Sequence, residues 1–117
     1  MSALRAAEIP ERDFMSNVIE AAELLGWRWA HFRPAKTAHG WRTPVSGPLG
    51  AGWPDLVLVR DRDGRMLFVE LKSEYGRVSE DQSAVLDYLR KIERLHGWLG
   101  VGVWRPSDWD RIVEILT

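Results

Sequence analysis

The sequence contains no cysteine, which excludes thiolate zinc sites, disulfide bonds and cysteine nucleophiles. It also lacks a long apolar run, because the longest nonpolar stretch, residues 98–104, is far too short to cross a bilayer. Residues 1–7 have no apolar core of the kind found in a signal peptide. These absences predict a soluble protein without membrane association, and the lack of cysteine suits the cytoplasm.

An excess of basic residues is also missing, since 16 Lys and Arg are matched by 17 Asp and Glu. A nucleic-acid-binding protein often has a basic balance, but the distribution of charge is more informative here. Residues 27–54 contain no acidic side chain, and in them Arg33, Lys36 and Arg42 are interleaved with aromatic residues such as Trp41. Cations neutralise phosphates and aromatic rings stack on bases, so this segment is a candidate nucleic-acid surface. A solvated loop with core tryptophans is the alternative.

The length and the composition, 45% hydrophobic and 28% charged, predict a single globular domain spanning residues 1–117. Apolar periodicity and turn residues predict helices alternating with strands. The expected elements are a helix over 10–25, a strand over 27–32, a long loop over 33–52 and a hairpin of 55–59 and 66–71. A helix from Ser79 to near Gly97, a strand containing Leu99, Val101 and Val103, and a short C-terminal helix follow. The core stripe of the helix that begins at Ser79 is expected to consist of Val85 or Leu86, Leu89 and Ile92. A loop as long as 33–52 is usually functional or mobile.

The hairpin carries the most informative residues of the chain. Asp55 begins its first strand, a turn is expected around Asp63-Gly64, and Glu70 and Lys72 end its second strand. Side chains alternate along a strand, so Glu70 and Lys72 share one face and Leu71 faces the core. An even number of residues in the connection would put Asp55 on the same face as Glu70, and an odd number would put it on the other.

Two carboxylates and an ammonium group at the ends of covered strands need partners, because burying an unpaired charge is costly. Mg²⁺ or Mn²⁺ prefers hard oxygen ligands and takes one or two carboxylates, completing its shell with water and substrate phosphate. Asp55 and Glu70 fit that role, the Leu71 carbonyl is a third candidate ligand, and Lys72 would act on the phosphate or the attacking water. An ordinary ion pair between Glu70 and Lys72 is the alternative.

Two helical residues are candidates for the same site. Glu11 lies three and seven residues before Phe14 and Val18, hence on the core-facing stripe of the first helix, although charge compensation at the helix N-terminus also explains it. Gln82 follows Ser79 by three residues and predicts a capping box, but its side chain could instead reach the sheet. These two roles are expected to compete for one amide.

In order along the chain, the motifs are Glu11-x-x-Phe14-x-x-x-Val18, Gly52-Trp53-Pro54-Asp55-Leu56, Glu70-Leu71-Lys72-Ser73 and Ser79-x-x-Gln82. This series resembles the VRR-NUC branch of the PD-(D/E)xK nuclease superfamily, in the small stand-alone form found in phages and bacteria. The resemblance implies a restriction-endonuclease-like α/β core, a mixed sheet of about four strands flanked by helices in the order α-β-β-β-α-β-α.

The resemblance also implies roles for individual residues. Asp55 and Glu70 would bind a divalent metal, Mg²⁺ with Mn²⁺ as a substitute. Lys72 would be catalytic, and Glu11 and Gln82 would be the helical glutamate and glutamine. Stand-alone relatives of this kind are typically cytoplasmic homodimers that act on branched DNA such as Holliday junctions. Ser73 and Arg77, which both follow the second hairpin strand, are further candidates for nucleic-acid contact.

We therefore expect a metal-dependent DNA endonuclease, in which a metal-activated water hydrolyses the phosphodiester and Lys72 assists it. The alternative from another class is a non-catalytic nucleic-acid-binding module whose carboxylates hold a structural ion. A hydrolase of free nucleotides is less favoured, because the sequence contains no glycine-rich phosphate loop.

Overall fold

The computed structural model describes residues 5–32, 35–38, 40–42 and 45–117. A four-stranded sheet in the order β1-β4-β5-β6 forms its centre, with β5 and β6 parallel and the other neighbours antiparallel. In chain order the helices and strands are α1 (Glu11–Leu24), β1 (Arg28–His31), β2 (Ala35–Thr37), β3 (Gly40–Arg42), β4 (Leu56–Arg60), β5 (Arg65–Leu71), α2 (Glu80–Glu93), β6 (Leu99–Trp104) and α3 (Trp109–Leu116).

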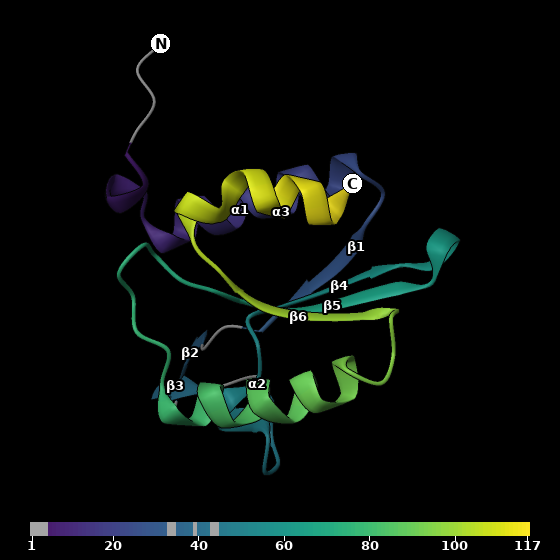
Figure 1. The fold of residues 1–117 in the computed structure, drawn as a ribbon. Coiled ribbons are helices and arrows are strands. Elements are labelled where there is room, and N and C mark those ends of the chain that lie inside the picture. The colour runs from purple at the N-terminus through teal and green to yellow at the C-terminus, as the bar shows by residue number, and fades with distance from the viewer. Residues whose placement is uncertain (1–4, 33–34, 39, 43–44) are drawn as a thin grey trace.

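The sheet lies between two layers of helices, with α1 and α3 on one face and α2 on the other (Figure 1). Omitting the small β2–β3 pair, the order is α-β-β-β-α-β-α, so the predicted fold class is confirmed. None of the helices in the described ranges is long and apolar enough to cross a membrane.

The main core fills the space between the sheet and the α1–α3 layer. Alternate residues of β4 and β5 point into this space, as the two-residue period of a strand requires, and meet apolar residues of both helices. The fully buried members include Leu56, Leu58, Leu71, Phe14, Val18, Ile112 and Leu116. Leu71 is therefore a core residue, as the alternation predicted.

α1 begins directly after Pro10, whose fixed φ suits the start of a helix. The helix ends before Gly26, which has a φ of +86° and can adopt this left-handed conformation without steric cost. Phe14, Val18 and Ala22 form its buried stripe. The predicted bounds of this helix are correct to within a residue at either end.

Antiparallel pairing of β4 and β5 confirms the predicted hairpin. Leu56 pairs with Val69, so the next position outward places Asp55 opposite Glu70. The connection between the strands consists of residues 61–64 and closes at Gly64, which has a φ of +66°. Its length is even, and Asp55 therefore shares a face with Glu70 and Lys72.

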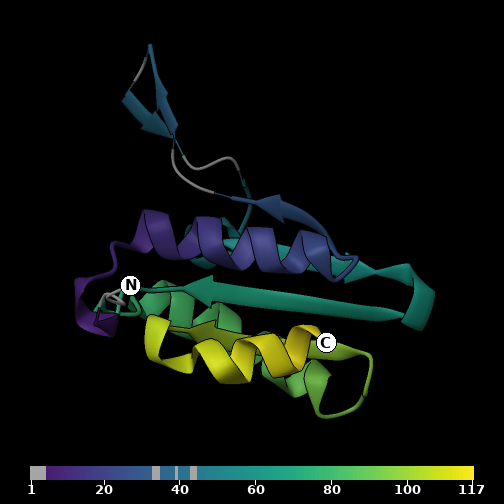
Figure 2. The same ribbon diagram turned by 90° about the horizontal axis from the view of Figure 1, so that it is seen from above.

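Residues 33–52 are not simply a loop, and that prediction is wrong in part. β2 and β3 form a separate two-stranded sheet, with Lys36 opposite Trp41, that projects from the rest of the protein (Figure 2). Strands of three residues are too short to show the alternation from which a strand is recognised in a sequence.

The outer end of α2 also differs from the prediction. Val85 and Leu86 are buried against the sheet, but Ile92, which was expected to continue their stripe, is 44% exposed. α2 packs on β6, the edge strand, and the described residues form no strand beyond β6 that could cover this side chain.

Candidate active site

The segment before β4 fixes the position of Asp55. Gly52 lies so close to the first turn of α2 that a Cβ atom here would collide with the backbone carbonyl of Asp81. Pro54 is fully buried beside it. The residues between them and β4 are thus held by backbone packing, which gives a physical reason for the Gly52-Trp53-Pro54 sequence ahead of the aspartate.

Asp55 bridges β1 and β5 through its own backbone and side chain. Its carbonyl accepts a hydrogen bond of 2.8 Å from the Phe32 amide, and its Oδ2 accepts one of 3.0 Å from the Leu71 amide. The second bond spans the end of the hairpin, so the carboxylate is anchored next to Glu70 rather than left to move in solvent.

Glu70 is fully buried at the end of β5. Its Oε1 accepts a hydrogen bond of 2.9 Å from Gln82 Nε2 and lies 3.8 Å from Lys72 Nζ, on a side chain that is only 14% exposed. Its Oε2 is buried, and no N–H group in the described part of the chain donates to it. The Asp55 carboxyl is close enough to share a hydrogen bond with Glu70, which requires a proton on one of the two groups.

The electrostatics of the site agree with this geometry. Burial, followed by a hydrogen bond with Asp55 and the negative charge of Asp55, raises the pKa of Glu70 to about 9. Lys72 acts in the opposite direction, and the charge of Glu11 adds to the increase. The site therefore concentrates more negative charge than Lys72 alone compensates, and a cation bound there would favour the ionised carboxylate.

Gln82 fulfils both predicted roles at once, so the expectation that they compete is wrong. Its Oε1 accepts from the Ser79 amide at 2.9 Å, and Ser79 Oγ accepts from the Gln82 amide at 3.1 Å, completing the capping box. The other end of the same side chain, Nε2, donates to Glu70. An amide carries its donor and its acceptor on different atoms, which allows this division.

Glu11 lies in the first turn of α1 and is partly buried, whereas Glu20 is exposed. Its charge contributes to the raised pKa of Glu70, which places it within electrostatic range of the hairpin carboxylates. Within the described ranges, no group of three or more acidic or histidine side chains is gathered closely enough to hold a metal ion by itself.

The donor set nonetheless fits a hard divalent cation. Such an ion needs only one or two carboxylates from the protein, and Asp55 and Glu70 face each other across the hairpin. The buried Oε2 of Glu70, to which no N–H group in the described residues donates, supplies a further oxygen. The side chain of Leu71 is in the core, so this residue could contribute only its carbonyl.

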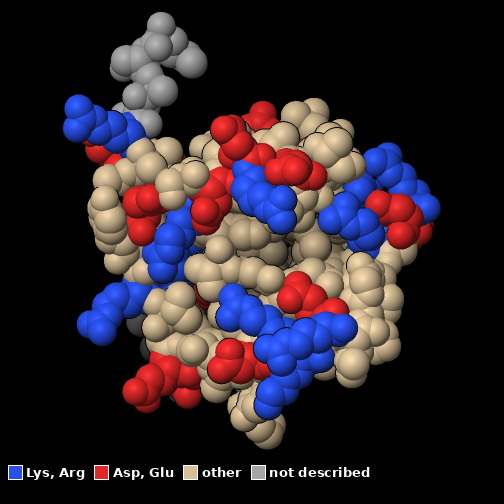
Figure 3. Space-filling view, viewed as in Figure 1, with Lys and Arg blue, Asp and Glu red and all other residues tan. Residues whose placement is uncertain are grey.

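Of the candidate nucleic-acid residues, the structure describes the side chains of Ser73 and Arg77 alone. Arg77 is exposed, and the Ser73 carbonyl accepts a hydrogen bond from Arg105. Arg33 lies outside the described residues, and of the residues of β2 and β3, including Lys36, Trp41 and Arg42, the structure describes the backbone alone. Acidic and basic side chains are mixed over the face seen in Figure 3, without a continuous basic surface there.

Arg105 is a residue that the sequence reasoning missed. One of its guanidinium nitrogens donates to the carbonyls of Ser73, Glu74 and Gly76, at 2.8, 3.2 and 2.7 Å. These bonds hold the segment that directly follows Lys72. An arginine some thirty residues away in the sequence gives no local signal for such a contact, so only the tertiary structure reveals it.

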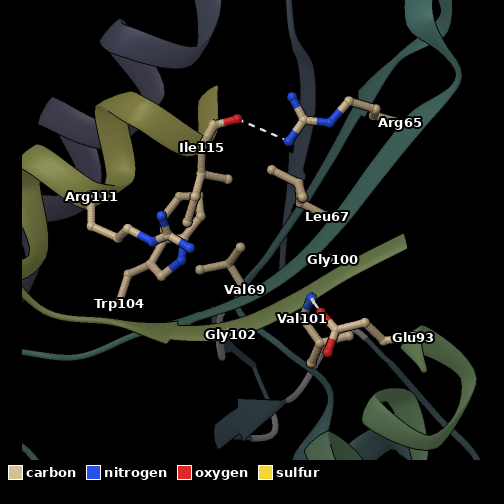
Figure 4. Close-up of a pocket in the computed structure, with 10 residues that line it drawn as sticks. All are labelled: Arg65, Leu67, Val69, Glu93, Gly100, Val101, Gly102, Trp104, Arg111 and Ile115. Atoms are coloured by element: carbon tan, nitrogen blue, oxygen red, sulfur yellow. Dashed lines mark hydrogen bonds between the residues drawn. The ribbon is translucent and has the colours of Figure 1, made fainter. Parts of the chain in front are cut away.

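A cavity of about 270 Å³ lies on the opposite face of the sheet, between α3 and the β5–β6 edge. Figure 4 shows Leu67 and Val69 rising from β5, with Arg65 and Arg111 at its sides. These β5 residues alternate with Phe68 and Glu70, so the cavity is separated from the carboxylate pair by the sheet itself.

Comparison with known families gives one match. The family model described as the VRR-NUC domain matches residues 24–99, which is more than half of the chain. The matched range contains Asp55, Glu70, Lys72 and Gln82, and Glu11 precedes it. No curated protein matches the chain.

Proposed function

The chain belongs to the VRR-NUC family, which implies a nuclease-type function with DNA as the substrate, and on that premise we propose that it is a metal-dependent DNA endonuclease. We further propose that its substrates are branched DNAs such as Holliday junctions and that it acts as a homodimer. Arg33, Lys36, Trp41, Arg42, Ser73 and Arg77 are its proposed DNA contacts.

The buried Glu70 carboxylate carries this proposal. It has a buried oxygen to which no N–H group of the described residues donates, it faces Asp55, and it lies beside a nearly buried lysine. Asp55 and Glu70 would hold Mg²⁺ or Mn²⁺, with Glu11 and the Leu71 carbonyl as further candidate ligands. A divalent cation held there would supply the Lewis-acid charge that activates water and neutralises the phosphodiester.

The protein's own side chains have distinct tasks in this mechanism. Gln82 donates to Oε1 of Glu70 and so fixes the carboxylate with Oε2 available. The Leu71 amide orients Asp55 in the same way. Lys72 Nζ, 3.8 Å from Glu70 Oε1, is placed to stabilise negative charge on the phosphate or to exchange a proton with the attacking water.

Cleavage assays test the proposal directly. Supercoiled, linear and four-way-junction DNA are incubated with the protein in Mg²⁺, in Mn²⁺ and in chelator. We expect metal-dependent products, with the junction cut fastest. Tight binding without products under every condition would refute the endonuclease and support the non-catalytic binding module instead.

Lys72→Ala provides the matching test of the site. Its cleavage rate should fall by about 10²- to 10⁴-fold, the usual contribution of a positioned proton-transfer group, while the far-UV circular dichroism spectrum stays unchanged. Lys91→Ala, an exposed lysine on α2, is the control and should cleave like the wild type. Wild-type turnover by Lys72→Ala would contradict the role given to this lysine.

A further inference from the structure

A second hollow lies on the segment that leads into β4, and its lining includes Trp53, two residues before Asp55. Its volume is about 330 Å³, and its lining consists of Phe32, Val45, Ser46, Pro48, Leu49 and Trp53. None of these side chains is charged, and only one is a small polar residue. The role of this hollow is not explained by metal binding or by phosphate chemistry, both of which need charged or strongly polar ligands.

The hollow is attached rigidly to the proposed catalytic residues. The amide of Phe32, one wall, donates to the Asp55 carbonyl at 2.8 Å. Trp53, the other wall, packs perpendicular to Phe68 with ring centroids 5.7 Å apart, and Phe68 shares its sheet face with Glu70. Two residues of chain span at most about 7 Å, so Trp53 and Asp55 are immediate neighbours in space.

The lining predicts the chemistry of an occupant. Phe32 and Trp53 are perpendicular, with ring centroids 6.1 Å apart, and form two aromatic walls. Val45, Pro48 and Leu49 make the remainder apolar, and Leu49 is 41% exposed. A flat ligand with apolar faces matches this combination, whereas a free phosphate does not.

We propose that this hollow holds one unpaired nucleobase of the DNA whose backbone lies at Asp55, Glu70 and Lys72. The inference rests on the proposed function, because it takes the carboxylate pair as the place where the phosphodiester is bound. A base inside a duplex is paired and stacked on both sides, so only an unpaired or extruded base can enter. Stacking of that base on one of the two aromatic rings would then favour DNA that offers such a base next to the bond to be cut.

This assignment gives a structural basis for selecting branched DNA. Glu70 is fully buried and Lys72 nearly so, which means that the backbone must approach a recessed site. Nucleotides at a branch point leave the helical stack at lower cost than those in a continuous duplex. The hollow would hold the base of such a nucleotide while its phosphate reaches the carboxylates.

Binding in the presence of chelator tests the inference without cleavage. Two labelled duplexes carry the same single-nucleotide bulge, one with a base and one with an abasic residue at the bulged position, and fluorescence anisotropy gives both affinities. The wild type should bind the base-containing bulge about tenfold more tightly, the factor that corresponds to one stacked base. Equal affinity for the two duplexes would overturn the inference.

Variants connect the preference to the hollow. Leu49→Ala opens one wall, and Phe32→Leu removes a ring while keeping an apolar side chain next to Trp53. Both should reduce the preference for the base to nearly onefold, whereas Leu24→Ala, which alters a leucine 81% exposed on α1, should retain it. A preference that persists in both hollow variants would place the base elsewhere and refute the assignment.

The same set of proteins separates this inference from the endonuclease proposal. Metal-dependent cleavage without any preference for the base would refute the hollow and leave the nuclease intact. A preference that depends on Leu49 and Phe32, combined with no cleavage in Mg²⁺ or Mn²⁺, would refute the nuclease and retain the hollow as a DNA-binding feature.

Discussion

Replacing Glu70 by glutamine is expected to remove a pH dependence from the stability of the metal-free protein. Burial and the proximity of Asp55 raise the pKa of Glu70 from 4.5 to about 9. Between these two values the folded protein retains a proton that the unfolded chain releases. Glutamine resembles the protonated carboxyl in shape and does not titrate, so Glu70→Gln keeps the packing and loses the linkage.

The sign and the size follow from proton linkage. Because the pKa is raised in the folded state, Glu70 stabilises the protein fully below pH 4.5, and this contribution is lost as the pH rises toward 9. One proton corresponds to about 1.4 kcal/mol per pH unit, so the free energy of unfolding should fall by about 3 kcal/mol between pH 4.5 and pH 7 from this group.

Urea unfolding in chelator, repeated from pH 5 to pH 9, measures the effect. The wild type should lose stability more steeply with pH than Glu70→Gln, by about 1.4 kcal/mol per unit at most. Titrating groups that do not interact with Glu70 affect both proteins equally and cancel in the difference. Glu20→Gln, at an exposed position on α1, is the control and should follow the wild type.

Addition of Mg²⁺ extends the same experiment. A cation prefers the ionised carboxylate, so its binding to the wild type should displace a proton, and it should stabilise the wild type more at pH 8 than at pH 6. Glu70→Gln should show neither effect. Parallel pH profiles for the wild type and Glu70→Gln in chelator would refute the reasoning, because they would mean that Glu70 is ionised in the metal-free fold.

Three further substitutions test other contacts by thermal or urea unfolding. Gln82→Ala should lose about 1 kcal/mol from the capping box and, unlike Ser79→Ala, should also reduce cleavage because Glu70 loses its donor; equal cleavage by these two variants would contradict this. Gly52→Ala should cost about 1–3 kcal/mol, since its Cβ meets the α2 backbone; unchanged stability would refute that packing. Arg60→Met should cost about 3 kcal/mol, because buried Arg60 donates to the Leu25 and Leu116 carbonyls and to Asp63; a neutral result would show these bonds to be dispensable.

The hairpin shows why part of the site could be predicted. Alternation along a strand is a property of the backbone, so the shared face of Glu70 and Lys72 follows from their spacing. The sequence predicted a turn at Asp63-Gly64 but left the parity of the connection open, and only the register in the structure places Asp55 opposite Glu70. The inferences that could be made depend on residues that are neighbours in the sequence or across one turn.

Contacts between distant segments could not be predicted in this way. The clamp of Arg105 on the segment after Lys72, the double use of the Gln82 amide and the aromatic hollow each depend on how helices and strands pack. Ile92 is a further example. Its spacing from Val85 and Leu86 predicted a buried side chain, but α2 packs on the edge strand of the sheet and Ile92 is exposed.

The sequence by itself determined the order of the elements around the central sheet and the shared face of Glu70 and Lys72, because periodicity and turn chemistry act locally. Only the tertiary structure decided that Asp55 lies opposite Glu70 and that Glu70 is fully buried, with one oxygen bonded to Gln82 and the other without an N–H donor in the described residues. The cost of desolvating a carboxylate depends on everything packed around it, and that surrounding is assembled from parts of the chain that are far apart in sequence.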